Sequence, residues 1–179
     1  MEKHENLADF DDYASDYREI HTKNVYGLSG ADSDYFSEYK ILEIKELLEG
    51  KDILDFGCGD GNTARFIEKD ISSYNYTGVD ISEKSIEEAK KKQLKNCNFQ
   101  KYDGIHIPFE DEKFDLIFVS CVFHHIEIKN HLLIFKELYR VLKKDGKLVI
   151  FEHNPLNPLT LKTVHDCPFD VGVNRRNVL

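Results

Sequence analysis

The chain has 179 residues and a formal net charge of −9, a length that suits one domain with a hydrophobic core of its own. Nucleic acid is excluded as the expected partner, because proteins that bind its phosphates present a basic face, whereas the lysines here are mixed with acids in helix-like stretches. No run approaches the roughly 20 consecutive apolar residues of a membrane span, so no membrane partner is expected.

The N-terminal sequence and the cysteines indicate a reducing, cytoplasmic location. The sequence begins MEKHENLADFDDYASDY, which is polar and acidic, unlike a secretory signal. The cysteines form no CxxC pair and lie at Cys58, Cys97, Cys121 and Cys167. We therefore expect reduced thiols rather than a disulfide framework or a cysteine zinc site.

Strand-like and helix-like stretches alternate from about Ile41 onward. In chain order, the pattern predicts a strand over 51–57, a helix over 62–71, a strand over 74–81, a helix over 83–96 with Ser82 as its N-cap, strands over 97–103 and 113–123, a helix over 128–146 that Gly146 ends, and a strand over 147–154. This order is typical of an α/β fold with a doubly wound, mostly parallel sheet.

Three segments are expected along the chain. Residues 1–40 form a helical lead-in that acts as a lid, residues 41–154 form the α/β core that binds a cofactor, and residues 155–179 form an irregular or helical tail. The tail is too short for a crossover helix and two more strands, so the sheet is expected to lack its last strands. Because an uncovered edge strand tends to pair with a neighbour, a homodimer that covers this edge, or poor solubility, is expected.

A glycine-rich turn follows the first predicted strand in DILDFGCGDGN, Asp52–Asn62. Gly57, Gly59 and Gly61 leave almost no side-chain surface, so the backbone can approach a ligand. Dinucleotides and S-adenosylmethionine both fit such a turn. Dinucleotide sites prefer GxGxxG, whereas this turn reads GxGxG, and Asp80 follows Gly61 by 19 residues, where a carboxylate can accept both hydroxyls of a ribose.

Four ordered stretches resemble the successive motifs of class I S-adenosylmethionine-dependent methyltransferases. They are DILDFGCGDGN, TGVDIS, YDGIHIPFEDEKFDLIFVSCVFHHI and ELYRVLKKDGKLVIFEHN, which together span about 51–154. The resemblance implies a Rossmann-like methyltransferase fold, S-adenosylmethionine as cofactor and a small-molecule acceptor. The tail sequences EHNPLNPLT and CPFD are similar to a subgroup associated with bacterial polysaccharide genes, which implies a saccharide hydroxyl as the acceptor.

The resemblance also implies roles for individual residues. Those expected to contact the cofactor are Gly57, Gly59 and Gly61 with the backbone of Cys58 and Asp60 along its methionine part, Asp55 near its ammonium, Asp80 on the ribose, Ile81 on the adenine face, Asp103 with the Gly104 backbone at the adenine amine, and the Ser120 backbone at the amino group. The alternatives are structural: Asp55 can hydrogen-bond turn amides, Ile81 can be core, Asp103 can cap the next turn and Cys58 can be a small turn residue.

Aromatic residues of the lead-in offer a further contact. Tyr13 and Tyr17 in FDDYASDY are four residues apart and so share one helix face. Tyr17 is expected to cover the cofactor, because aromatic faces suit a cation. The alternative is an ordinary amphipathic face that packs on the domain.

Histidines near the ends of two predicted strands are candidate general bases. A hydroxyl acceptor must lose its proton when it attacks the methyl group of a sulfonium, and histidine is the natural base near neutral pH. His124 is expected first, then His153, then His125, with loop orientation as the structural alternative. No metal is expected, because neighbouring side chains on an extended segment point apart.

The sequence therefore predicts a methyltransferase that acts on a small-molecule hydroxyl. A second hypothesis is a non-catalytic or truncated module that binds S-adenosylmethionine without turnover. A third is an NAD-dependent oxidoreductase, which the GxGxG spacing and the lack of a recognisable hydride-transfer site disfavour.

Overall fold

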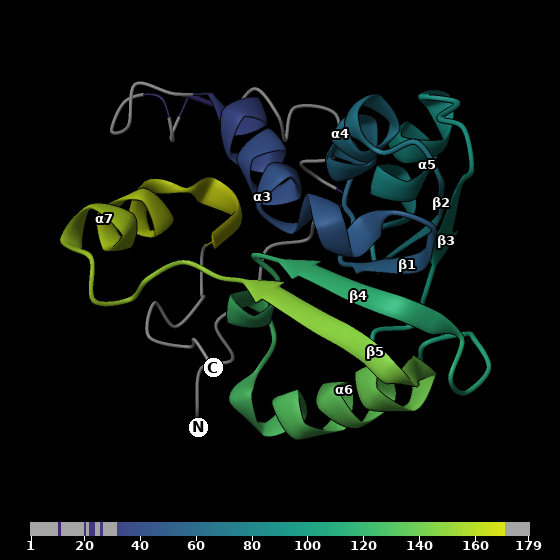
Figure 1. Cartoon of the computed structure of the whole chain (residues 1–179). Helices are drawn as coiled ribbons and strands as arrows, with labels where there is room; N and C mark the ends of the chain where they lie inside the picture. Colours follow the sequence, from purple (N-terminus) through teal and green to yellow (C-terminus); the bar gives the residue numbers. More distant parts are fainter. Residues whose placement is uncertain (1–10, 12–19, 21, 24–25, 27–31, 171–179) are drawn as a thin grey trace.

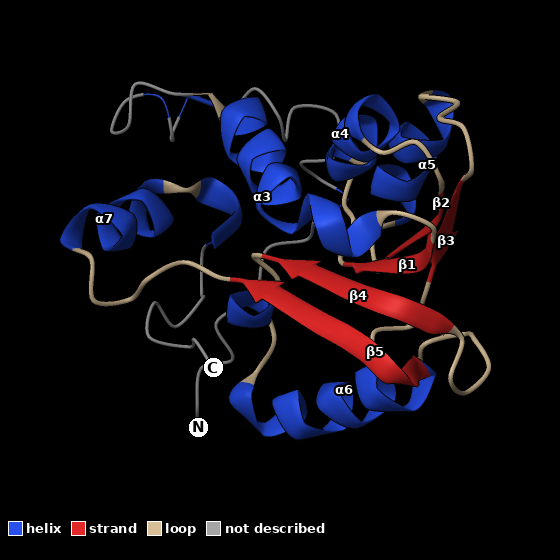
Figure 2. Ribbon diagram, in the orientation of Figure 1, coloured by secondary structure: helices blue, strands red, loops and turns tan. Residues whose placement is uncertain are grey.

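The computed structural model describes residues 11, 20, 22–23, 26 and 32–170. Most of the expected lead-in lies outside this part of the chain, including Tyr13 and Tyr17. The main elements, drawn in Figure 2, are α3 (Ser33–Leu48), β1 (Lys51–Phe56), α4 (Asn62–Asp70), β2 (Tyr74–Asp80), α5 (Glu83–Lys91), β3 (Cys97–Lys101), β4 (Phe114–Ser120), α6 (Ile128–Val141), β5 (Leu142–Phe151) and α7 (Pro158–Asp166). Short 3₁₀ helices lie at η1 (Phe123–His125) and η2 (Pro168–Asp170).

The five strands form one sheet in the order β3-β2-β1-β4-β5, and every neighbouring pair is parallel. The chain winds outward from β1 through β2 to β3, then crosses back to β4 on the other side of β1. The strand order therefore reverses between β1 and β4, and ligands in such sheets bind beyond the carboxyl ends of the strands at this point. The predicted α/β fold class is confirmed.

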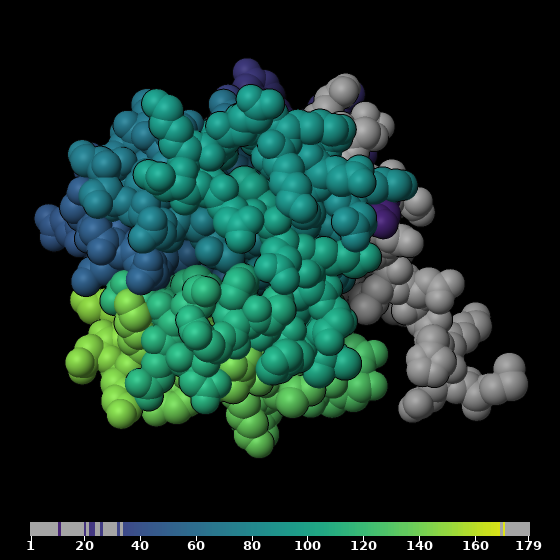
Figure 3. All heavy atoms as spheres, turned by 90° about the vertical axis from the view of Figure 1, so that its right-hand side faces the viewer, coloured from purple at the N-terminus to yellow at the C-terminus, as the bar shows by residue number. Residues whose placement is uncertain are grey.

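Helices cover both faces of the sheet (Figure 1). Helices α3, α4 and α5 pack on one face, where Ile53 of β1 and Phe118 of β4 belong to the same buried cluster as Ile67. Helix α6 packs on the opposite face, where Leu54 shares a buried cluster with Leu138. Figure 3 views the molecule from the side on which α5, β2 and β3 lie in Figure 1, and shows teal atoms over much of this face. Burial on both faces explains the almost continuous apolar runs of β1 and β4.

The predicted helical stretch over 128–146 ends earlier than expected. Helix α6 stops at Val141, and Leu142 already pairs with Phe114 at the start of β4. The ladder is irregular between Phe114 and Leu116, so the chain reaches Lys147 before regular pairing resumes. Gly146 is needed for close packing rather than as a helix stop, since a Cβ there would lie 2.6 Å from Leu142 Cδ1.

The tail is helical where it is described. Helix α7 begins after Asn157, whose side chain accepts a hydrogen bond from the Leu159 amide, and η2 returns the chain toward the carboxyl ends of β4 and β5. Among the described strands, β5 pairs only with β4. Helix α3 runs across residue 40, the expected limit of the lead-in. No described helix has both the length and the apolar character needed to cross a bilayer.

Candidate cofactor and acceptor site

The glycine turn after β1 combines two packed positions with one open position. Gly57, Gly59 and Gly61 all have positive φ, at 78°, 52° and 73°. A Cβ on Gly57 would lie 2.4 Å from Val122 Cγ2, and one on Gly61 would lie 2.9 Å from the Phe99 ring. Among the described residues, a Cβ on Gly59 would meet no atom within 4 Å. The turn therefore packs into the protein at both ends and leaves a bare backbone at its centre.

Hydrogen bonds hold this turn in place. The amides of Gly57 and Cys58 both donate to the carbonyl of Val79, at 2.8 and 3.0 Å, and the Gly61 amide donates to the Cys58 carbonyl at 3.0 Å. Gly61 is then the N-cap of α4. The positive end of this helix consequently points toward the open side of the turn.

Asp80 links the glycine turn to the end of β2. One carboxylate oxygen accepts the Gly59 amide at 2.8 Å, and the other accepts the Ser82 amide at 2.9 Å. The carboxylate thus has a structural role in addition to the ribose contact expected from the sequence. Each carboxylate oxygen has a second lone pair, which leaves acceptor capacity for hydroxyl groups.

The residues expected at the adenine end lie together beside Asp80. Ile81 is 48% exposed, which argues against the alternative that it is a core residue. Gly104 lies next to it, since a Cβ there would be 3.5 Å from Ile81 Cγ2. Asp103 caps the following turn, because its Oδ1 accepts the amides of Ile105 and His106 at 2.8 and 2.7 Å. These backbone bonds lower the pKa of Asp103, so it is an anion at neutral pH.

Asp55 faces the protein interior rather than the surface. Its side chain is 1% exposed, and its Oδ2 accepts a 2.5 Å hydrogen bond from the Tyr76 hydroxyl rather than from turn amides. Burial raises the pKa of this carboxyl to about 7, although the Tyr76 hydrogen bond acts in the opposite direction. Because Asp55 is buried, its carboxyl does not reach the surface of the turn, where it was expected to contact the ammonium of the cofactor.

Cys58 and Asp60 contribute backbone rather than side-chain chemistry to the turn. The Cys58 side chain is buried, and burial raises the pKa of its thiol, so the sulfur stays neutral. The Asp60 carboxylate and carbonyl both accept hydrogen bonds from the Lys92 ammonium at the end of α5. This pairing leaves the backbone of the turn as the surface for a ligand.

Lys40 is a site residue that the sequence analysis missed. It projects from α3 and donates a 2.7 Å hydrogen bond to Ser120 Oγ at the end of β4, with the Cys121 sulfur at 3.6 Å. It therefore lies beside Ser120, one of the residues that the resemblance places at the amino-acid part of the cofactor. A lysine on an amphipathic helix gives no sequence signal for such a position, because most such lysines lie on solvated faces.

The three candidate histidines lie together in one cluster beyond β4 and β5. The ring centroids of His124 and His125 are 4.0 Å apart, and those of His124 and His153 are 4.8 Å apart. Glu152 Oε2 lies 2.8 Å from His124 Nδ1, and Asp170 Oδ1 lies 3.6 Å from His124 Nε2. Asp170 Oδ1 also lies 3.4 Å from His125 Nε2.

The expectation that neighbouring histidines point apart is wrong for this segment. His124 and His125 belong to the 3₁₀ helix η1, not to an extended strand, so both rings reach the same carboxylate of Asp170. Asp170 belongs to the CPFD stretch but was not among the predicted site residues, because only the return of the tail through α7 brings it here. The reason given for expecting no metal, that neighbouring side chains point apart, therefore does not apply to His124 and His125.

The cluster shifts the pKa values of its two adjacent histidines in opposite directions. Burial opposes protonation of His124, but the nearby carboxylates of Asp170 and Glu152 outweigh burial and raise its pKa to about 9. Burial, together with the charge of His124, lowers the pKa of His125 to about 4. Without another cation, His124 is protonated and His125 is neutral at pH 7.

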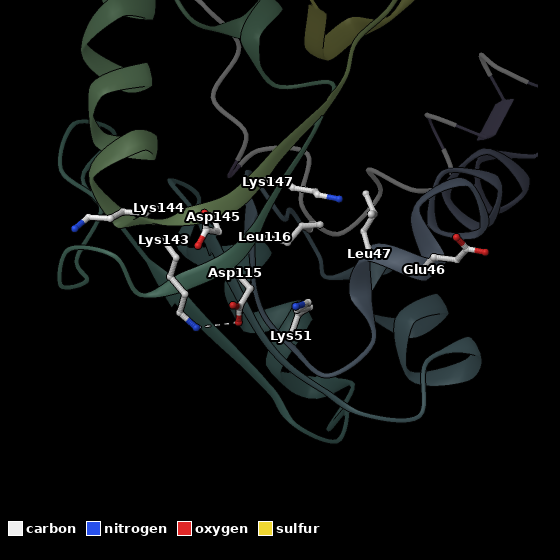
Figure 4. Close-up of a pocket in the computed structure, with 10 residues that line it drawn as sticks. Glu46, Leu47, Lys51, Asp115, Leu116, Lys143, Lys144, Asp145 and Lys147 are labelled. Atoms are coloured by element: carbon white, nitrogen blue, oxygen red, sulfur yellow. Dashed lines mark hydrogen bonds and ion pairs between the residues drawn. The ribbon is translucent and has the colours of Figure 1, made fainter.

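A depression of about 350 Å³ lies at the other end of the sheet (Figure 4). It is lined at the amino ends of β1, β4 and β5, with Lys143, Asp115 and Lys147 among its residues. Lys143 is bonded to Asp115 at 2.9 Å across it. Because ligands of parallel sheets bind at carboxyl ends, we do not assign the cofactor to this depression.

Residues 54–150, just over half of the chain, match the family model described as a methyltransferase domain. A demethylmenaquinone methyltransferase of Lactobacillus johnsonii is 33% identical over 129 residues, which cover 68% of this chain and 50% of the relative. A phthiotriol/phenolphthiotriol dimycocerosates methyltransferase of Mycobacterium ulcerans is 28% identical over 127 residues, covering 70% and 46%.

A solved methyltransferase structure shares the fold of this chain. The crystal structure of a SAM dependent methyltransferase from Aquifex aeolicus aligns with a TM-score of 0.65 and 26% identity, over 80% of this chain and 74% of that chain. The chain spans about half the length of the curated relatives it matches.

Proposed function

Because the chain belongs to the class I S-adenosylmethionine-dependent methyltransferases, we propose that it transfers a methyl group from S-adenosylmethionine, the methyl donor of this family, to a small-molecule hydroxyl. The observation that carries this proposal is the position of the glycine turn beside the histidine cluster. Val122, which packs against Gly57, stands two residues before His124 in the chain. A donor at the turn would therefore lie next to an acceptor at the cluster.

The residues of the turn fit this donor. When bound, S-adenosylmethionine supplies a methyl group activated by a positively charged sulfur. The open backbone at Gly59 would border its amino-acid part. The Asp80 carboxylate would accept the ribose hydroxyls, and the exposed Ile81 would cover the adenine. We also propose the other cofactor contacts expected from the sequence, including the contact with Tyr17.

His153 is our proposed general base, with a supporting role for His124. The pKa of about 9 at His124 means that this residue already holds a proton at neutral pH and cannot accept another. Its role in the proposed reaction is to pair with the carboxylates of Glu152 and Asp170 beside His153. The His153 ring lies edge-on to His124, in the same cluster at the carboxyl end of β5. The proximity of acceptor and donor should also lower the barrier, because in-line displacement needs the acceptor oxygen, the methyl carbon and the sulfur in one line.

The proposed acceptor is a saccharide hydroxyl, supported by the tail sequences EHNPLNPLT and CPFD. The structure supports an acceptor contact with this tail, because Asp170 of CPFD joins the histidine cluster. The curated relatives carry names that specify other small molecules, demethylmenaquinone and phthiotriol dimycocerosates. An acceptor panel should therefore contain saccharides, quinols and phenols.

Two measurements test the proposal. Calorimetry with S-adenosylhomocysteine and with NAD should show binding of the first alone; binding of NAD alone would restore the oxidoreductase hypothesis. Transfer of a labelled methyl group to the acceptor panel should then be slowed by His153→Ala in single turnover. Cofactor binding with no transfer to any acceptor would favour the non-catalytic module instead.

Two further expectations concern the whole protein. A second copy that covers the free edge of β5 would make a homodimer, which sedimentation velocity would detect as a species of twice the monomer mass; a monomer at all concentrations would contradict it. The spacing of the cysteines supports the expected cytoplasmic location, which localisation of a tagged full-length protein would test.

A further inference from the structure

We propose that His124, His125 and Asp170 form a binding site for a divalent transition-metal ion of the zinc type. The site combines two imidazole nitrogens with one carboxylate oxygen, a donor set suited to such ions and open to a further ligand. Residues of η1 and η2, far apart in the chain, bring these three atoms together. The metal site itself does not depend on the identity of the methyl acceptor.

The distances from Asp170 Oδ1 to the two histidine nitrogens fit a shared ion better than hydrogen bonds. Asp170 Oδ1 lies 3.6 Å from His124 Nε2 and 3.4 Å from His125 Nε2, and the three atoms lie within 4.8 Å of one another. Neutral hydrogen bonds between nitrogen and oxygen span about 2.7–3.2 Å. Two ligands about 2.0–2.1 Å from a tetrahedral ion lie roughly 3.3–3.4 Å apart, which is close to both distances.

Glu152 presents the correct nitrogen of His124 to the site. Its Oε2 lies 2.8 Å from His124 Nδ1, while its Oε1 accepts the amides of Val122 and Phe123 at 2.7 and 2.6 Å. A proton on Nδ1 directed at a carboxylate leaves the Nε2 lone pair for a metal, and this outer partner is a regular feature of histidine metal ligands. Glu152 is thus fixed by the backbone before it orients the ring.

Burial makes the lack of a close partner at Asp170 informative. The Asp170 side chain is 9% exposed, and among the described residues its Oδ1 accepts no hydrogen bond. A buried carboxylate oxygen without a hydrogen bond calls for an ion or a water molecule. The His125 side chain, at 16% exposed, is the most open of the three and marks the side from which a ligand would enter.

The role of the ion in methyl transfer rests on the proposed function. A bound divalent ion would coordinate the acceptor hydroxyl and lower its pKa, so that His153 can remove the proton. The oxygen then forms a bond to the methyl carbon while the carbon–sulfur bond breaks and its electron pair stays on sulfur. The ion keeps its oxidation state throughout, and no further reactant is required.

Metal binding is tested directly with the tag-free protein. After treatment with a chelator, titration with Co²⁺ should produce visible absorption bands that saturate at one equivalent, and Zn²⁺ should abolish them by displacement. His125→Ala and Asp170→Asn should each lose the bands. His106→Ala is the matched control, because His106 forms an exposed pair with Glu137 and should leave the titration unchanged.

Binding of S-adenosylhomocysteine shows whether each variant is folded, since the glycine turn uses none of these three ligands. Loss of the cobalt bands with retained binding of the cofactor product supports the site. No bands in the parent protein, or bands that persist in both ligand variants, would overturn it. One equivalent of metal without methyl transfer to any acceptor would leave the site standing and count against the proposed function alone.

Discussion

The pH dependence of the unfolding free energy tests whether the buried Asp55 carboxyl is neutral in the folded chain. The substitution Asp55→Asn keeps the shape of the side chain and an oxygen that can accept the hydrogen bond from Tyr76. The asparagine cannot ionise. The difference in unfolding free energy between the parent protein and this variant should therefore change with pH in a way that reports the Asp55 carboxyl alone.

The size and sign of this effect follow from the pKa. Burial raises the pKa of Asp55 from an ordinary value of 3.8 to about 7 in the folded chain. Between these pH values the folded state keeps a proton that the unfolded state has released, so stability falls as pH rises, by at most about 1.4 kcal/mol per pH unit. The parent protein should lose up to roughly 4 kcal/mol relative to the variant between pH 4 and pH 7.5.

Urea unfolding at several pH values measures the difference. The chain has no tryptophan, so circular dichroism is a suitable signal. Tyr76→Phe is a useful second variant, because the Tyr76 hydrogen bond lowers the pKa of Asp55 and its removal should move the transition to higher pH. A difference between parent and Asp55→Asn that stays constant from pH 4 to pH 7.5 would refute the reasoning, since it would mean that the carboxyl has the same pKa in both states.

Three further predictions concern the glycine turn and helix α6. Gly57→Ala should destabilise the chain strongly because of the Val122 contact, whereas Gly59→Ala should cost only about 1–2 kcal/mol for its left-handed backbone and should weaken S-adenosylhomocysteine binding; equal effects in urea unfolding would contradict this contrast. Leu138→Ala, at a fully buried position under the sheet, should lower the unfolding free energy by about 2–5 kcal/mol, and a loss below 1 kcal/mol would argue against the packing of α6. Arg140→Met should reduce thermal stability and expose residues 107–111 to proteolysis, because the guanidinium donates to two carbonyls of that loop; unchanged cleavage there would show that the loop is held by other contacts.

The strands and most helices could be predicted because their local signals agree with the fold. Helix α4 buries Ala64, Phe66 and Ile67 on one side, as the spacing indicates, and Ser82 caps α5 as predicted. The end of α6 could not be predicted, because Leu142 satisfies helical spacing equally well. Only the pairing of Leu142 with β4 selects the strand.

The candidate site was predictable where one motif carries it and not where distant segments meet. The glycine turn and the Asp80 carboxylate lie on adjacent parallel strands, so the sheet brings them together. Lys40 and Asp170 come from outside this core, and their contacts depend on how α3 and the tail pack. The structural role of Asp80 was also hidden, because its partner is the amide of Gly59 and amides carry no sequence signal.

A crystal structure with S-adenosylhomocysteine is the most direct test of the central claim that the glycine turn and Asp80 form the cofactor site. The ligand should lie at the carboxyl ends of β1 and β2, with its amino-acid part against Gly59 and its ribose hydroxyls on the Asp80 carboxylate. Ligand bound instead in the depression near Lys143 and Asp115, or a turn closed by the side chains of the protein with no ligand, would contradict it.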